Sequence, residues 1–93
     1  MTTKKEQEKR AKLEAKIDKA IKKICENKPS NIRPKKWGLV NDHEVELVYW
    51  YWYFEDKKLS KLMDRIMDTI YKKFGIEVSA CADTTEQLNW HYL

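Results

Sequence analysis

The most reactive side chains in this sequence are two cysteines and two histidines. Cys25, His43, Cys81 and His91 lie far apart along the chain, and none of them belongs to a CxxC or similar close pair. Because zinc ligands usually come in close pairs, this spacing does not favour a metal site. Two distant cysteines are instead typical of free thiols in a reducing compartment. We therefore expect neither a metal nor a structural disulfide.

Motifs that build a catalytic centre are also missing from the sequence. It holds no GxGxxG, P-loop or HExxH pattern, and its two glycines offer little from which to form a phosphate-binding loop. The acidic residues Glu44, Glu46, Glu55 and Asp56 border predicted strands and helix starts, where carboxylates are normally solvated or cap a helix. His91 could act as a general base, but no spacing places a nucleophile beside it. The sequence predicts a protein that is not an enzyme and needs no cofactor.

The most distinctive stretch runs from Val45 to Phe54 and ends in six consecutive aromatic residues. β-Branched and aromatic residues favour a strand, whereas a helix would spread these rings around its whole circumference. Since alternate residues of a strand point to opposite faces, the stretch divides into two rows. The rows are Val45, Leu47, Tyr49, Tyr51 and Tyr53 on one face, and Glu44, Glu46, Val48, Trp50, Trp52 and Phe54 on the other. Both faces become apolar after Leu47, which predicts a strand covered on both sides.

Two helices are predicted to support this strand. Thr3 and Glu6 form a capping box, and helix-forming residues continue to Asn27 without a Gly or Pro. The first ten residues of this helix have nothing to bury, so we expect residues 1–10 to project from a folded body of residues 11–93. A second helix is predicted from the N-cap Asp56 to residue 74, with a wide apolar stripe and with Gly75 as its C-cap.

Further strands are predicted at residues 35–40, 76–81 and 87–92. The last of these has an alternative, because Thr84 and Gln87 also resemble a capping box, which would make residues 85–93 a short helix. Trp90 fits the alternation of a strand better than the spacing of a helix. The chain therefore runs helix, strand, strand, helix, strand, strand.

The predicted fold class is α+β, a two-layer sandwich formed by residues 1–93 as a single domain. If the fourth strand returns by a short hairpin and inserts between the second and third, the sheet is antiparallel throughout, in the order 1-2-4-3. Both helices can then cover one face. This α-β-β-α-β-β arrangement is close to a ferredoxin-like topology that lacks its usual first strand and gains one at the end.

The two faces of this sheet are expected to differ in what covers them. The residues assigned to the helix side are Val45, Leu47, Tyr49, Tyr51, Ile76, Val78, Leu88 and Trp90. The residues assigned to the open side are Val48, Trp50, Trp52, Phe54, Glu77, Ser79, Asn89 and His91, although the alternation allows the opposite parity. An open patch with two tryptophans and a phenylalanine is larger than a soluble monomer usually leaves uncovered.

Positive charge is concentrated in the first part of the chain. Residues 1–36 hold thirteen Lys and Arg against five Asp and Glu, for a charge of +8, whereas residues 37–93 hold six against ten, for −4. The chain is thus a basic arm on a mildly acidic body, and the arm could meet an acidic protein surface or nucleic acid, or serve only the solubility of the protein.

These features predict stoichiometric binding of a protein partner, as an inhibitor or adaptor of the kind that phages and mobile elements also encode. Large rigid rings supply most of the energy at protein interfaces. The predicted anchors are Trp50, Trp52, Phe54, Val48 and Trp37. The predicted cations that steer an acidic partner are Lys9, Arg10, Lys12, Arg33, Lys35 and Lys36. A homodimer is the favoured assembly, and the oligomer number and the identity of another partner stay open.

Single-stranded nucleic acid is the alternative partner. An open antiparallel sheet with aromatic rings beside a basic arm resembles in outline the sheets that stack RNA bases. The Lys/Arg-Gly-aromatic signature of that family is missing, and Glu44 and Glu46 on the same face would repel phosphates. No apolar run approaches the length of a membrane span, and no apolar segment follows the charged start, so we expect a cytoplasmic protein without membrane contact.

Overall fold

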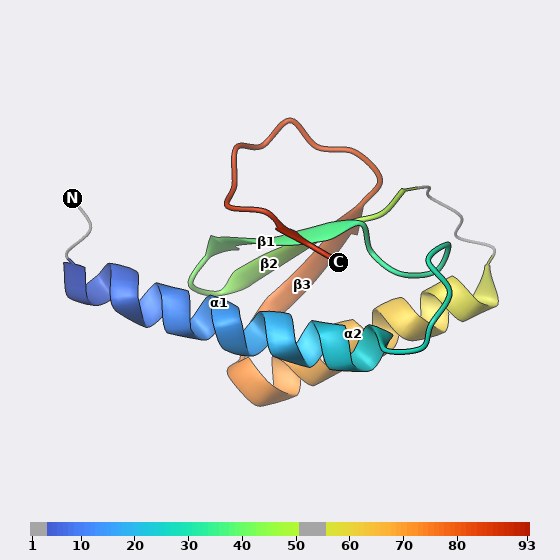
Figure 1. The fold of residues 1–93 in the computed structure, drawn as a ribbon, viewed down its shortest axis with the longest axis horizontal. Helices are drawn as coiled ribbons and strands as arrows, with labels where there is room; N and C mark the ends of the chain where they lie inside the picture. Colours follow the sequence, from blue (N-terminus) through green and yellow to red (C-terminus); the bar gives the residue numbers. More distant parts are fainter. Residues whose placement is uncertain (1–3, 51–55) are drawn as a thin grey trace.

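A computed structural model describes residues 4–50 and 56–93. The elements in chain order are α1 (Lys4–Cys25), β1 (Lys36–Asn41), β2 (Glu44–Val48), α2 (Lys57–Phe74), β3 (Glu77–Cys81) and β4 (His91–Tyr92). The two helices pack together on one face of a four-stranded sheet, and the segment between β3 and β4 arches over the other face (Figure 1). The predicted α+β class is therefore confirmed.

The helix α2 matches its prediction closely. Asp56 is its N-cap, and the carboxylate accepts hydrogen bonds from the backbone N–H groups of Lys58 and Leu59. At the other end Gly75 adopts φ 67°, a left-handed conformation that glycine enters without strain, and its N–H donates to the carbonyl of Tyr71. The apolar stripe of α2 enters the core through Leu59, Leu62, Ile66 and Ile70.

The helix α1 has an exposed first half and a buried second half. Residues 4–12 are all exposed, as their lack of an apolar stripe predicts, and burial begins at Glu14 and Ile17. Arg10 nevertheless holds this first half to the sheet, since its Nη2 donates to the carbonyl of Leu39 over 2.8 Å. Among the described residues, no helix combines the length and the apolar character that crossing a bilayer requires.

The predicted strand order and the all-antiparallel pairing are wrong. The sheet is mixed, in the order β3-β2-β1-β4, and β2 pairs directly with β3 in parallel. The crossover through α2 requires β2 and β3 to run in the same direction, and no strand lies between them. The strand β4 pairs instead with the free edge of β1, at Trp37 with His91 and at Lys36 with Tyr92.

The hairpin expected after β3 does not form, because the chain uses residues 82–90 as an arch over the sheet. The strand expected over 87–92 forms only at its end, as the two residues of β4, and the alternative of a terminal helix is wrong. The long strand expected at 45–54 is also shorter than predicted, because the regular strand β2 ends at Val48. Tyr49 still donates its N–H to the carbonyl of Cys81, and the expectations for residues 51–55 lie outside the described residues.

The face of β2 that meets the helices is the predicted one. Val45, Leu47 and Tyr49 are buried in the same core as the helix stripes, together with Ile76, which directly precedes β3. The placement of the last segment is wrong, because Leu88 and Trp90 lie on the outer face beside Gly38. His91 lies opposite Trp37, whose side chain is buried on the helix side of β1. The side chain of His91 therefore also points toward the helices.

Gly38 is the point at which the arch lies closest to the sheet. A Cβ atom at this position would lie 2.9 Å from Cε3 of Trp90 and 3.2 Å from Cδ1 of Leu88. Real Cβ atoms essentially never come within 3.0 Å of a non-bonded heavy atom, so the absence of a side chain at Gly38 lets the Trp90 ring lie close against β1.

Gly38→Ala should therefore destabilise the protein by overpacking, at a cost of about 1 to 3 kcal/mol in the free energy of unfolding. The same substitution in a Trp90→Ala background should cost much less, since the ring that blocks the methyl group is gone. Urea denaturation of the four proteins measures this coupling. Equal costs of Gly38→Ala in both backgrounds would show that Trp90 does not lie on Gly38.

Candidate binding surface

The outer face of the sheet carries a group of aromatic rings and lysines that we call the aromatic–lysine patch. It consists of Lys35, Lys36, Trp50, Trp90 and Tyr92. The Nζ of Lys35 lies 4.6 Å from the ring centroid of Trp50, and the Nζ of Lys36 lies 4.5 Å from that of Trp90 and 5.7 Å from that of Tyr92. Such cation–π contacts hold the ammonium groups and the rings together at one end of β1.

Two rings of the patch are largely exposed. Trp50 is 59% exposed and Tyr92 is 64% exposed, and among the described residues the only other large apolar side chain that is so exposed is Tyr71 on α2. Tyr71 lies in the helix layer, whereas Trp50 lies beside Lys35 and Tyr92 lies beside Lys36, the next residue along the chain. Among the described residues, the exposed rings of the sheet thus lie near the start of β1.

The backbone around Lys35 explains why the patch forms there. The N–H of Lys35 donates to the carbonyl of Val48 over 2.7 Å, and its own carbonyl accepts from the N–H of Leu93 over 3.1 Å. The start of β1, the end of β2 and the last residue of the chain are thereby bound to one another. The rings of Trp50 and Tyr92 come to lie on either side of the two lysines as a consequence.

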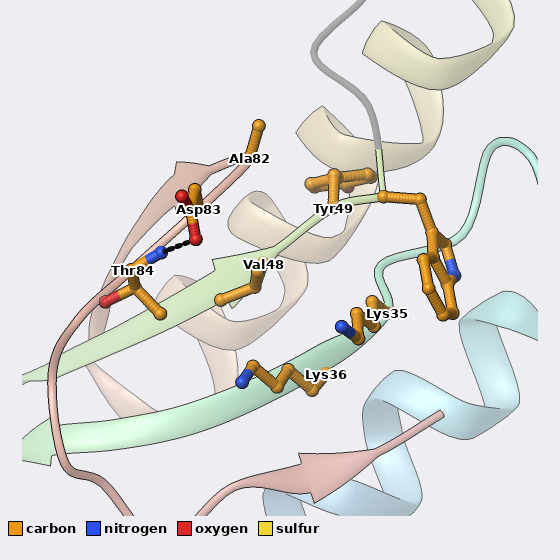
Figure 2. Close-up of a pocket in the computed structure, with 8 residues that line it drawn as sticks. Lys35, Lys36, Val48, Tyr49, Ala82, Asp83 and Thr84 are labelled. Atoms are coloured by element: carbon orange, nitrogen blue, oxygen red, sulfur yellow. Dashed lines mark hydrogen bonds between the residues drawn. The ribbon is translucent and has the colours of Figure 1, made fainter.

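A small cavity opens within the patch (Figure 2). It has a volume of about 90 Å³ and lies between the start of the arch, at Ala82, Asp83 and Thr84, and the two lysines. Asp83 accepts a hydrogen bond from the backbone N–H of Thr84 over 2.8 Å, which fixes its carboxylate at the rim. The cavity has room for a single inserted side chain and offers ammonium groups to a carboxylate.

The predicted anchors divide into exposed, buried and undescribed residues. Trp50 is exposed as expected, whereas Val48 is 3% exposed beneath the arch and Trp37 is 0% exposed. A side chain without accessible surface contributes to the core of the monomer, so we leave Trp37 and Val48 out of the surface. Trp52 and Phe54 lie outside the described residues. Tyr92 and Trp90 belong to the patch but were not predicted, because the assumed strand phase pointed them elsewhere.

The predicted steering cations fall into separate groups. Lys35 and Lys36 belong to the patch, and Arg33 lies half-buried in the loop before them. The others, Lys9, Arg10 and Lys12, are exposed on the first half of α1. That half lies at the opposite end of the sheet, beside the turn between β1 and β2 (Figure 1). The structure therefore does not bring the basic arm and the exposed rings together.

A second cluster of polar groups fastens β4 to α1. The ring of His91 stacks on Trp37 with 4.4 Å between centroids, and its Nε2 lies 3.7 Å from Oε1 of the buried Glu14. The indole N–H of Trp37 donates to Oδ1 of Asp18 over 3.0 Å, and Asp18 pairs with Lys22 over 2.9 Å. The sequence pattern places His91 on the open face and does not single out Glu14. The one sequence feature that points to Glu14 is its position one helical turn before Asp18, on the same side of α1.

The shifted pKa values of Asp18 and of the two cysteines follow from burial, hydrogen bonds and neighbouring charges. Burial alone would raise the pKa of Asp18, but the hydrogen bond from Trp37 and the ion pair with Lys22 outweigh it and hold that pKa below its ordinary value. Burial and the hydrogen bond to Glu46 raise the pKa of Cys81 to about 12, and burial raises the pKa of Cys25. Both cysteines are free thiols, as predicted, and both are held protonated, unlike a reactive thiolate.

Within residues 4–50 and 56–93, no three His, Cys, Asp or Glu side chains come together as a metal ion would require. Comparisons with protein family models, with curated proteins and with solved structures found no match to this chain.

Asp18→Asn should lower the free energy of unfolding at neutral pH by about 1 kcal/mol, since a charge-assisted hydrogen bond and an ion pair are weakened. Because the pKa of Asp18 is lower in the folded protein than in the unfolded chain, its carboxylate stabilises the fold above the ordinary aspartate pKa. That contribution is lost as the pH falls through the folded-state value. The stabilities of wild type and variant should thus converge in acid, as measured by urea denaturation.

Asp68→Asn is the matched control for Asp18→Asn. Asp68 forms the same type of ion pair with Lys72, four residues on, over 3.0 Å, but its side chain is 62% exposed and binds no indole. Exposed pairs contribute little, so a change within about 0.5 kcal/mol is expected. Equal effects of the two substitutions would show that Trp37 does not depend on Asp18.

Proposed function

We propose that the protein acts without turnover, by stoichiometric binding of a protein partner through the aromatic–lysine patch. The observation that supports this proposal is the exposure of Trp50 and Tyr92 on a face that the helices do not cover, each beside a lysine ammonium group. Exposed rings that are held rigidly supply much of the binding energy at protein interfaces, and neighbouring charges select the partner.

The small size of the cavity supports binding over catalysis. At about 90 Å³ it is well below the roughly 300 to 1,000 Å³ of small-molecule sites. The charged groups among its described lining residues are the ammonium groups of Lys35 and Lys36 and the carboxylate of Asp83, and no histidine is among these residues to act as a base. A single apolar or acidic side chain of a partner fits this space better than a substrate does.

A second copy of the chain is the first partner to test, because the outer face carries unlike charges at its two ends. At the patch end of the sheet, Lys36 of β1 lies opposite Val48 of β2 in the backbone register. At the other end of β2, Glu44 lies opposite Glu77 of β3. Two copies related by a two-fold axis can place the lysines of one against the glutamates of the other. This arrangement would also cover Trp50.

Single-stranded nucleic acid is the second candidate partner, and the exposed rings beside ammonium groups favour it. Two features favour a protein instead. Lys35 and Lys36 lie over the faces of Trp50 and Trp90 on which a base would have to stack. Asp83 at the cavity would repel a phosphate. Nucleic-acid binding would show itself by an affinity that falls steeply with salt concentration.

Trp50→Ser tests the proposal, with Tyr71→Ser as its matched control. Both substitutions remove an exposed ring, at 59% and 60% exposure, but only Trp50 belongs to the patch. If the partner is a second copy, light scattering should give about twice 11.2 kDa for wild type and for Tyr71→Ser, and 11.2 kDa for Trp50→Ser. Both substitutions should leave the unfolding transition nearly unchanged, because exposed rings contribute little to the core.

A wild type that stays monomeric at high concentration would exclude the second copy. The same two variants then serve as baits in capture experiments from the native host. Proteins held by wild type and by Tyr71→Ser, but lost with Trp50→Ser, would be the partners that the patch selects. Identical capture by all three proteins, or a captured fraction that consists of nucleic acid, would contradict the proposal.

A further inference from the structure

A groove on the helix side of the molecule is lined by several residues, and among those that the structure describes all the charged ones are positive. It lies between the loop after α1 and the first half of α2, and we call it the basic groove. Its lining residues are Asn27, Lys28, Pro29, Ile32, Lys58, Lys61, Leu62 and Arg65. The groove is open to solvent, has a volume of about 480 Å³, and shares no residue with the aromatic–lysine patch.

We propose that the basic groove binds a short acidic segment of a partner protein, with one apolar side chain inserted between flanking carboxylates. This surface is additional to the proposed function, which concerns the outer face of the sheet.

Helical spacing gives one wall of the groove. Lys58, Lys61, Leu62 and Arg65 are three, four and seven residues apart on α2, so they project from the same side of the helix. The other wall is the loop after α1, which turns at Asn27 with φ 63°. Two backbone hydrogen bonds hold this loop, from Lys28 to the carbonyl of Cys25 and from Ile32 to that of Pro29. Backbone hydrogen bonds thus hold both walls of the groove in place.

The cations of the groove have no anionic partners. Lys28, Lys58, Lys61 and Arg65 form no side-chain ion pair or hydrogen bond with any residue in the described part of the chain. Elsewhere the same helices do pair their lysines, as Lys22 with Asp18 and Lys72 with Asp68. Four neighbouring like charges repel one another, and an acidic ligand would relieve that repulsion.

The floor of the groove distinguishes a peptide from nucleic acid. Ile32 and Leu62 are almost fully buried beneath it, at 6% and 5% exposure, so the apolar surface of the groove comes mainly from the exposed Pro29 and from the aliphatic stems of the lysines. A small apolar surface with cations around it fits a segment that offers one leucine or similar side chain among glutamates or aspartates. Among the described residues that line the groove none is aromatic, so this lining gives unpaired bases nothing on which to stack.

The test is a fluorescence anisotropy titration with a short labelled peptide in which glutamates flank a single leucine. Lys61→Glu combined with Arg65→Glu should weaken binding at least about tenfold. The matched control is Lys16→Glu with Lys19→Glu, which removes the same net charge from exposed positions of α1 outside the groove. The control should bind within about twofold of wild type. Trp50→Ser should bind as wild type does, which separates this surface from the patch.

Lys61→Gln with Arg65→Gln repeats the test without new negative charge on α2, and circular dichroism confirms that each variant is folded. Equal losses in the groove variant and in the α1 control would show attraction by net charge alone and would overturn the proposal. So would undiminished binding of a peptide with glycine in place of leucine, tighter binding of an oligonucleotide of the same charge, or no binding of the peptide to wild type.

Discussion

The packing of Trp37 is the interaction on which the rest of the structure depends. This side chain lies in β1, is fully buried, binds Asp18 of α1 through its indole N–H, and stacks on His91 of β4. A single residue therefore joins the central strand to a helix and to the last strand. Without it β4, which is only two residues long, would have little to hold it at the edge of the sheet.

The position of β4 decides which part of the outer face is covered. Because β4 pairs with β1 at Trp37 and Lys36, the chain must cross the sheet from β3 to reach it, and the arch covers Gly38 and Val48 on the way. The end of the sheet at Lys35 and Trp50 stays outside this cover. Apart from Trp90, which belongs to the arch, the aromatic–lysine patch is thus the part of the outer face that residues 82–90 leave uncovered.

Local sequence signals predicted the parts of the fold that local chemistry determines. The caps Asp56 and Gly75 fix both ends of α2, and the alternation of Val45, Leu47 and Tyr49 identifies the face that meets the helices. The strand order depends on long-range contact instead. The alternation of Leu88 and Trp90 is compatible with a hairpin and with the arch. In the structure both side chains lie against Gly38 of β1, where there is no side chain to exclude them. No local pattern shows the space beside Gly38.

The candidate surfaces likewise combine features that local sequence predicts with features that depend on long-range contacts. Exposure of Trp50 follows from strand alternation, whereas the partnership of Lys36 with Tyr92 needs the pairing of β1 with β4. The basic groove was not predicted, because Lys58, Lys61 and Arg65 belong to a half of the chain with net negative charge. Only folding separates these cations from the acidic residues of that half.

Hydrogen exchange of the tryptophan indole N–H groups, followed by NMR, measures the central claim most directly. Trp37 is held between α1 and β4, whereas the ring of Trp50 is largely exposed to solvent. In the monomer the Trp37 indole should exchange slowly, close to the rate of global unfolding, and the Trp50 indole should exchange at once. Rapid exchange at Trp37, or strong protection at Trp50 in the monomer, would contradict this claim.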